Sequence, residues 1–338
     1  MVLRLDVTPP NPHDIGATQP ELLRFTRRRL CVLCYLPDNT AMPARKIQQL
    51  ILITGANGQI ASEVCRALRA DHHPILAVDV DPDPAAGVVA CDLREKAEIE
   101  RLFQANPICA VIHLAAVLPT AFRADPGSGA QVNLIGACEL LRQSVQSHVK
   151  RFVFASSMSV YGLAPRPRPC SETDPATPED PYGGSKRAVE LVGEALVRTG
   201  AIEFVALRIA RVIGPGARKT SSPWRSQILD PPPGLTSISI PFAPHANLSL
   251  VHVEDVARML ITLVQAPKLA RTVYNTPAEQ WEAARLKTVI EESIGIRIEL
   301  GAEGAHAGPA CDGACFEHEF GFQLRPLRDR LARRESKS

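Results

Sequence analysis

The sequence predicts an α/β fold, a doubly wound parallel sheet with a small C-terminal α/β region that binds substrate. Short apolar runs rich in β-branched residues alternate with amphipathic stretches from residue 49 onward. A glycine-rich turn follows the first of these runs. Such alternation produces βαβ units, whose parallel sheet is covered by helices on both faces.

The elements follow from the local patterns. Helices are expected at residues 60–68, 132–145 and 253–264, where the apolar residues recur at helical spacing. Another helix is predicted to begin near Thr276, because Thr276 and Glu279 form a capping box with Pro277 at the first helical position. Strands are expected at residues 50–53, 75–78, 88–91, 110–114, 151–155 and 204–208.

A glycine-rich turn, Thr54-Gly-Ala-Asn-Gly-Gln-Ile-Ala61, ends the first strand and opens the first helix. Glycines let the backbone approach a pyrophosphate, and the helix N-terminus supplies N–H groups and a partial positive charge. This is the arrangement of a Rossmann fold. The candidate cofactor-binding residues here are Gly55, Asn57, Gly58, Gln59 and Ile60.

Asp79, at the end of the second predicted strand, indicates which dinucleotide binds. A carboxylate there accepts both ribose hydroxyls of NAD and repels the 2′-phosphate of NADP. No Arg or Lys follows it before Arg94 to compensate that repulsion. NAD is therefore the expected cofactor; the alternative is that Asp79 is only a solvated aspartate in a turn.

Ser157, Tyr182 and Lys186 are the candidate catalytic residues. A tyrosine four residues before a lysine on one helix places both side chains on the same face. The ammonium is expected to lower the pKa of the phenol, so that tyrosinate takes a hydroxyl proton as hydride leaves the same carbon. Ser157 would hydrogen-bond the substrate oxygen.

These motifs occur in an order that resembles a known family. After TGANGQIA come Asp92-Leu93, His113-Leu-Ala-Ala116, Asn133, SSMSVYG from Ser156, PYGGSK up to Lys186, and HVEDVA from His252. The order is similar to that of the NAD-dependent epimerase/dehydratase branch of the extended short-chain dehydrogenase/reductase family, over roughly residues 48–295. By this resemblance Asp92 contacts adenine. The further cofactor-binding residues that it implies are Leu93, Leu114, Ala115, Ala116, Asn133, Tyr182 and Lys186.

The resemblance also implies a homodimer, in which the helices at residues 130–149 and 182–198 pair into a four-helix bundle. One departure from the family pattern concerns the substrate. The sugar-nucleotide epimerases carry an asparagine shortly after the strand at residues 204–208, where it helps to hold the diphosphate, and here Arg211 stands at about that place.

The segment from Gly214 to Arg225 is more similar to that of the family's dehydrogenases of small hydroxy acids. Its cations could clamp a carboxylate or phosphate. The alternative for Arg211 is a structural role, paired with Glu254 or Asp255. The candidate substrate-binding residues are Ser156, Ser157, Arg211, Ser222 and Arg225, with Arg218, Lys219 and Ser221 in the same loop.

Composition excludes other classes of protein. The formal net charge of +2 gives no general attraction to nucleic acid. No stretch approaches the ~20 apolar residues of a membrane span, and nine scattered cysteines indicate a cytoplasmic protein with reduced thiols. Cys31 and Cys34 have metal-like spacing, and Cys311 and Cys315 form a looser pair. Because no nearby His or third Cys completes a set around the first pair, no metal is expected.

Three regions are predicted. Residues 1–45 are rich in proline and lack a periodic apolar face, so they are expected to be disordered or an artefact of an upstream start codon. Residues 46–210 form the NAD-binding Rossmann domain with Ser157, Tyr182 and Lys186. Residues 211–338 mainly bind substrate, with segments that return to the sheet.

The expected function is hydride transfer between NAD and a secondary alcohol of a small, anionic sugar, sugar acid or hydroxy acid. One alternative is a nucleotide-sugar epimerase or dehydratase with tightly bound NAD. Another is a non-catalytic NAD-binding protein, against which the intact set of serine, tyrosine and lysine argues.

Overall fold

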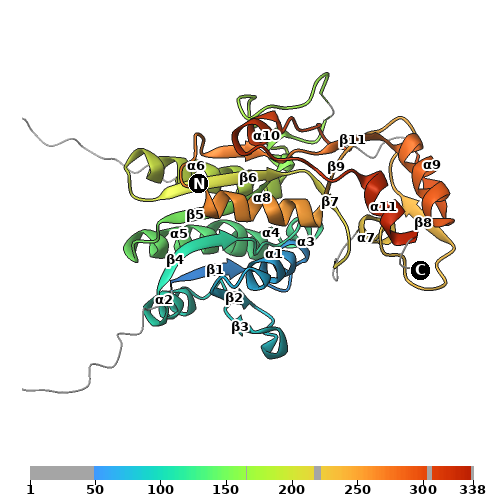
Figure 1. Cartoon of the computed structure of the whole chain (residues 1–338). Coiled ribbons are helices and arrows are strands. Elements are labelled where there is room, and N and C mark those ends of the chain that lie inside the picture. Colours follow the sequence, from blue (N-terminus) through green and yellow to red (C-terminus); the bar gives the residue numbers. More distant parts are fainter. Residues whose placement is uncertain (1–48, 165, 217–221, 303–306, 336–338) are drawn as a thin grey trace, which may run out of the picture. The chain divides into compact units, whose positions relative to one another are not determined.

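A seven-stranded sheet organises the fold, in the order β10-β6-β5-β4-β1-β2-β3 (Figure 1). Every neighbouring pair in it is parallel. This agrees with the predicted Rossmann arrangement. The strands are β1 (Leu50–Thr54), β2 (Ile75–Asp79), β3 (Val88–Ala90), β4 (Ile108–His113), β5 (Arg151–Ser157), β6 (Glu203–Ile209) and β10 (Val273–Asn275).

The computed structural model describes residues 49–164, 166–216, 222–302 and 307–335. They belong to one unit, Ile47–Ser338. The predicted extension at residues 1–45 lies outside the described residues, and Cys31 and Cys34 lie outside them too, as do Arg218, Lys219 and Ser221.

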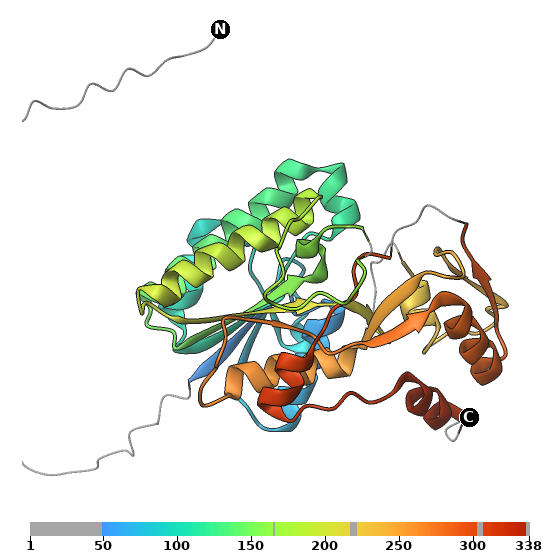
Figure 2. The ribbon, with the colours of Figure 1, turned by 90° about the horizontal axis from the view of Figure 1, so that it is seen from above.

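Helices cover both faces of the sheet (Figure 2). On β1, Ile51 and Ile53 join one apolar core while Leu52 joins the other, because successive strand side chains point to opposite faces. The first core contains α1 (Gln59–Ala70), α8 (Val253–Gln265) and α10 (Ala314–Phe320). The second contains α2 (Lys96–Ala105), α5 (Ala137–Gln146) and α6 (Pro181–Arg198).

The predicted helix at residues 132–145 begins as a π-helix, η2 (Gln131–Gly136), before it continues as α5. Gly136 is required here, because a Cβ at this position would lie 2.7 Å from the carbonyl oxygen of Leu93. The shorter helices nearby are η1 (Pro84–Ala86), α3 (Pro119–Ala124), α4 (Pro126–Ala130) and η3 (Met158–Tyr161).

The chain after β6 builds a smaller region with its own apolar core around Trp224, Phe242 and Trp281. Its strands form a three-stranded sheet, β11-β9-β7, and a separate pair, β12-β8. The strands are β7 (Arg211–Ile213), β8 (Ser237–Ile240), β9 (Asn247–His252), β11 (Glu279–Glu282) and β12 (Arg297–Leu300); the helices are α7 (Trp224–Gln227), α9 (Ala283–Ile294) and α11 (Leu327–Glu335). Among the described helices, none is long and apolar enough to cross a membrane.

The prediction of a helix that begins near Thr276 is wrong. Thr276 accepts a hydrogen bond from the Ala210 amide at 2.9 Å instead of capping a helix. Glu279 starts β11, and its carboxylate accepts the Leu327 amide at 2.7 Å. Contacts with distant parts of the chain thus use both capping side chains, and the helix begins at Ala283.

Candidate active site

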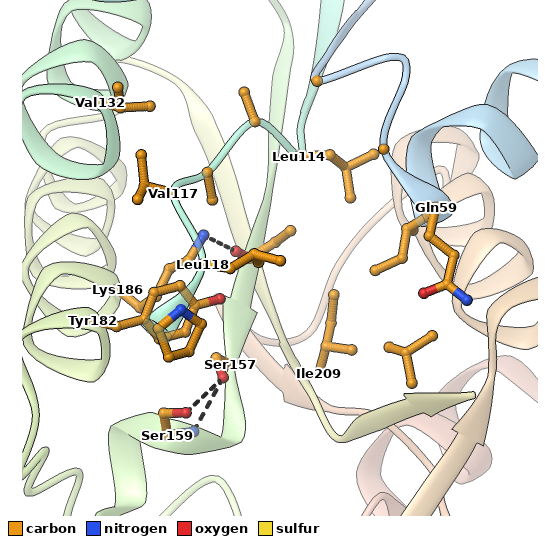
Figure 3. A pocket seen from close by; sticks show the side chains of 18 of the residues that line it. Gln59, Leu114, Val117, Leu118, Val132, Ser157, Ser159, Tyr182, Lys186 and Ile209 are labelled. Carbon is orange, nitrogen blue, oxygen red and sulfur yellow. Dashed lines mark hydrogen bonds between the residues drawn. The ribbon is translucent and has the colours of Figure 1, made fainter. Parts of the chain in front are cut away.

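A cavity of about 980 Å³ lies at the carboxyl ends of the central strands (Figure 3). This is where open α/β sheets bind their ligands. Of the predicted site residues that the structure describes, all except Asn133 line the cavity: Gly55, Asn57, Gly58, Gln59, Ile60, Asp79, Asp92, Leu93, Leu114, Ala115, Ala116, Ser156, Ser157, Tyr182, Lys186, Arg211, Ser222 and Arg225.

The glycine-rich turn has the shape that a dinucleotide diphosphate needs. Gly55 has φ +70°, and a Cβ there would lie 2.7 Å from the Cα of Ala115. The Gly58 amide donates to the Gly55 carbonyl at 2.8 Å, which closes the turn directly before α1. The N-terminus of α1 therefore opens onto the cavity, and the turn fits the diphosphate of NAD.

Asp79 is fixed at the end of β2 by the same turn. Its Oδ2 accepts the Asn57 amide at 3.0 Å, and its Oδ1 accepts the Asp81 amide at 3.1 Å. Each carboxylate oxygen keeps a further lone pair for a hydroxyl, so Asp79 fits the ribose of NAD. Asp92 also lines the cavity, and its Oδ1 accepts a hydrogen bond from Arg94 Nε at 2.9 Å.

Two side chains shape the loop after β4. Thr54 Oγ1 accepts the amides of Leu114 and Ala115, each at 3.2 Å. Asn133 Oδ1 accepts the Val117 amide at 2.7 Å, and its Nδ2 donates to the Val117 carbonyl at 2.9 Å. Asn133 is buried behind the loop and does not line the cavity. It was predicted to bind the cofactor, and its position corrects this to holding the loop that borders the cofactor site.

Tyr182, Lys186 and Ser157 lie together on one wall of the cavity (Figure 3). Asp180 caps α6 by accepting the Gly183 amide at 2.7 Å, which sets the first turn of the helix beside β5. Lys186 Nζ donates to the Ala155 carbonyl at 2.8 Å and lies 5.6 Å from the Tyr182 ring centroid. The phenol and the ammonium are thus held from α6 against the end of β5.

Burial determines how these groups ionise. It raises the pKa of Tyr182 to about 12, and a hydrogen bond with Ser157 and the positive charge of Arg225 oppose the rise. Burial also lowers the pKa of Lys186 to about 7, against the charge of Glu190. The phenol pKa was expected to be lowered by Lys186. Burial instead raises it, and Ser157 and Arg225 only reduce the rise, while Lys186 donates to the Ala155 carbonyl.

Ser156 was predicted to bind substrate, but its hydroxyl has another partner. Ser156 Oγ donates to Glu190 Oε1 at 2.6 Å, and the side chain is buried. Ser157, the next residue along β5, hydrogen-bonds Ser159 at the cavity instead. Both serines line the cavity, but the Ser156 hydroxyl proton is used by Glu190, and the alternation of a strand sends the two side chains to opposite faces, so Ser157 is the better placed of the two to meet a substrate oxygen.

Arg211 and Arg225 bring two positive charges into the cavity. In both, Nε is buried without a hydrogen-bond acceptor among the described residues, and neither guanidinium forms an ion pair with them. Arg211 Nη2 donates to the Ala307 carbonyl at 2.9 Å. Burial, together with the charge of Arg225, lowers the pKa of Arg211 to about 9. An anion between them would relieve both the desolvation and the repulsion.

The alternative role for Arg211, pairing with Glu254 or Asp255, is wrong. Those carboxylates accept from Arg330, at 2.7 Å and 2.8 Å. Arg330 lies on α11, far along the chain, and no local pattern indicates this pairing. Arg211 instead packs its guanidinium 4.7 Å from the Phe242 ring centroid.

Sequence reasoning missed one part of the wall. Ala307, Gly308 and Pro309 line the cavity from near the C-terminal end of the chain. Gly308 has φ +75°, and a Cβ there would lie 3.4 Å from Met158 Cε. The Gly-Pro pair signals only a loop; no periodicity or motif indicates that this loop reaches the site.

The fold and the cavity together define a class: a Rossmann-fold protein with a dinucleotide site beside a buried tyrosine and lysine. The model of the NAD dependent epimerase/dehydratase family matches residues 51–276. The chain belongs to this family, whose cofactor is NAD.

Curated relatives include both epimerases and a dehydrogenase. The chain is 31% identical to a UDP-glucose 4-epimerase of Lacticaseibacillus casei over 48% of its own length and 52% of that protein, so it spans about half of this relative. It is 27% identical to a UDP-glucose 4-epimerase of Vibrio cholerae, over 68% of this chain and 71% of the relative. It is 24% identical to a D-erythronate dehydrogenase of Haemophilus influenzae, over 67% and 75%.

Solved structures agree on the fold. The L-threonine dehydrogenase from Phytophthora infestans superposes with a TM-score of 0.78 at 20% identity, covering 86% of this chain and all of that one (100%). MoeE5, solved in complex with UDP-glucose and NAD, has a TM-score of 0.72 at 28% identity, covering 85% and 99%.

Proposed function

We propose that this protein is an NAD-dependent dehydrogenase that oxidises a secondary alcohol of a small sugar acid or hydroxy acid. The observation that carries the proposal is the pair Arg211 and Arg225, two guanidiniums that share the cavity with Tyr182 and form no ion pair among the described residues. A carboxylate is the natural partner of such a pair, since a guanidinium grips it with two parallel hydrogen bonds.

The residues of the site suit this oxidation. NAD, when bound, accepts the hydride from the carbinol carbon. Tyr182, as phenolate, takes the hydroxyl proton, so that the alcohol loses a hydride and a proton and becomes a carbonyl. Ser157 donates to the same substrate oxygen and holds it near the phenol. Arg225 keeps the phenol pKa from rising further and holds the acid group of the substrate.

The D-erythronate dehydrogenase of Haemophilus influenzae supports this substrate class, because erythronate is a small hydroxy acid. The second candidate function is nucleotide-sugar epimerisation, which the UDP-glucose 4-epimerase relatives favour. Arg211 argues against it, since the epimerases place an asparagine at about that position. An epimerase returns the hydride to its substrate and accumulates no NADH, which separates the two functions.

A matched pair of substrates tests the proposal. Purified protein is mixed with NAD and either D-erythronate or erythritol, which has a hydroxymethyl group in place of the carboxylate, and NADH fluorescence is followed. We expect NADH to form with the acid and much more slowly with the neutral polyol. Other short hydroxy acids, such as glycerate and threonate, extend the panel.

Arg225→Met should then raise KM for the acid by roughly 10- to 100-fold, as a lost charge-assisted contact does. The kcat/KM of the neutral polyol should fall much less, only through the higher pKa of Tyr182 that follows from losing the charge of Arg225. Arg285→Met is the matched control, because Arg285 lies over Trp281 and does not line the cavity. The proposal fails if no acid reduces NAD, or if Arg225→Met affects acid and polyol alike.

A further inference from the structure

Gln59 lies in the glycine-rich turn, but its side chain is directed across the cavity. It is found on the side opposite Tyr182 (Figure 3). Gln59 Nε2 donates to the Gly214 carbonyl at 2.7 Å and to the Pro215 carbonyl at 3.1 Å. Both N–H bonds of the side-chain amide are therefore donated to the loop after β7. Only the backbone N–H of Gln59 is then available to a bound diphosphate.

Gly214, which receives one of these bonds, is itself held closely. It has φ +123°, and a Cβ there would lie 2.8 Å from Val253 Cγ1 and 2.9 Å from His252 Nε2. This carbonyl therefore has a defined position beside the end of β9 and the start of α8. A side chain other than glycine would be strained both by the backbone angle and by these neighbours.

Gly214 also binds the segment that carries the substrate arginine. Its amide donates to the Arg225 carbonyl at 2.9 Å, and the Arg225 amide donates to the Ser222 carbonyl at 3.2 Å. Two direct hydrogen bonds thus run from Gln59 through Gly214 to Arg225. They join the turn that meets the cofactor to the helix α7 that presents a guanidinium to the cavity.

We infer that Gln59 is a positioning residue that transmits NAD binding to Arg225. A bound diphosphate fixes the turn from Gly55 to Gln59; the Gln59 amide then fixes Gly214, and Gly214 fixes Arg225. The consequence is that NAD prepares the acid subsite before the substrate arrives. Because coupling free energy is reciprocal, a bound acid must tighten NAD by the same factor. The role assigned to Arg225 rests on the proposed function, whereas the link between the two segments does not.

Backbone hydrogen–deuterium exchange with and without NAD tests the link and needs no substrate. In the parent protein, NAD should slow exchange of the turn at residues 55–60, and also of Gly214 and of α7, by roughly 3-fold or more. In Gln59→Met, which keeps the length of the side chain but has no donor, NAD should still slow the turn. Its effect on Gly214 and α7 should be lost.

Two further variants serve as a rescue and as a control. Gln59→Lys, which restores an N–H donor of similar reach, should recover the effect at α7. Arg66→Met changes an exposed side chain of the same helix and should match the parent protein. Titration with NAD should give an affinity for Gln59→Met within about 3-fold of the parent, because a neutral hydrogen bond to another segment has been removed.

The inference is overturned if NAD leaves α7 unchanged in the parent, or slows it equally in Gln59→Met. Loss of NAD binding by Gln59→Met would also overturn it, since the side chain would then be a cofactor ligand. With the acid substrate, Gln59→Met should raise KM by roughly 3- to 10-fold with kcat within about 2-fold. If no acid reduces NAD but NAD still slows exchange at α7 through Gln59, the proposed function is rejected and the link between Gln59 and Arg225 is supported.

Discussion

At the scale of single residues, the site combines groups whose pKa values are shifted by burial toward the neutral form. Tyr182 stays protonated and Lys186 loses its proton more easily than in water. Arg211 shows the same effect, and the charge of Arg225 adds to it. Lys186 and Arg211 regain their positive charge most easily when negative charge enters the cavity, so these two groups favour an anionic ligand, whereas the Tyr182 phenolate forms most easily beside the positive charge of Arg225.

Tyr182→Phe should abolish turnover while it leaves NAD binding nearly intact. The phenol acts on the transition state, and losing a general acid–base group costs about 10²- to 10⁴-fold in rate. Steady-state kinetics together with an NAD titration measure the two effects separately. Turnover like that of the parent enzyme would reject the assignment of Tyr182.

The pH dependence follows from the raised pKa of Tyr182, which is about 12 in the unliganded protein. Oxidation needs the phenolate, which is scarce below this pKa and increases about tenfold per pH unit. The kcat/KM for oxidation should therefore rise with pH, and the reverse reduction, which uses the protonated phenol, should be favoured as pH falls. A profile for oxidation that falls above neutral pH would contradict this.

At the scale of elements, a buried polar network joins β5, β6 and α6 behind the catalytic wall. Arg208 donates to both oxygens of Glu190, at 2.9 Å and 2.8 Å, and to the Tyr161 hydroxyl at 2.8 Å. Ser156 donates to the same carboxylate, and Tyr161 donates to Asn275 Oδ1 at 2.8 Å. Since Glu190 follows Lys186 by one helical turn, the network also fixes the face of α6 that carries the ammonium.

Removing one member of this network should destabilise the fold strongly. Arg208→Met leaves the Glu190 carboxylate buried without its main partner, which costs about 3–5 kcal/mol of unfolding free energy. The double variant Glu190→Gln/Arg208→Met should lose less than the sum of the two single variants, because no charge is then left unpaired. Urea unfolding measures all three. Strictly additive losses would show that the two side chains are not coupled.

The sequence predicted the elements well where local physics decides them. Strands buried on both faces are continuous β-branched runs, so β1, β2, β4 and β5 were found within a few residues. Tyr182 and Lys186 were predicted from their spacing on one helical face together with the other motifs of the family, and the structure places both on α6 at the cavity. The prediction of a helix start at Thr276 was wrong, because its hydroxyl accepts from Ala210, far away in the chain. The sequence also did not show that the Ser156 hydroxyl donates to Glu190 or that Asn133 bonds Val117.

The rest of the site depends on contacts that no local pattern encodes. Ala307 reaches the cavity from near the end of the chain, and the Gln59 amide meets Gly214 from the other half of the sequence. Both contacts exist only once the smaller region has docked beside the sheet. The first contact shapes the substrate side of the site, and the second joins the cofactor turn to that side. The cofactor side depends mainly on one local strand–turn–helix pattern, so it could be predicted more fully from the sequence.

At the scale of the whole molecule, the helical layer opposite α1 and α8 exposes apolar side chains. Ile135 on η2 is 53% exposed, and Leu191 and Val192 on α6 are 50% and 38% exposed. Along α6, Gly184, Ala188 and Leu191 fall at helical spacing on this face. A stripe of small and apolar residues on neighbouring helices suits pairing with a second copy about a two-fold axis.

We therefore expect a homodimer built on α6 and the η2–α5 helix. Light scattering after gel filtration should give a mass near twice the 36.6 kDa of the chain. Leu191→Asp should shift the protein to a monomer, because a carboxylate would be buried unpaired at the centre of the contact. Val89→Asp is the matched control: Val89 is 51% exposed on the edge strand β3, away from this face, and its substitution should leave the dimer intact. A parent protein of monomer mass at micromolar concentration would contradict the dimer, and equal behaviour of the two variants would place the contact elsewhere.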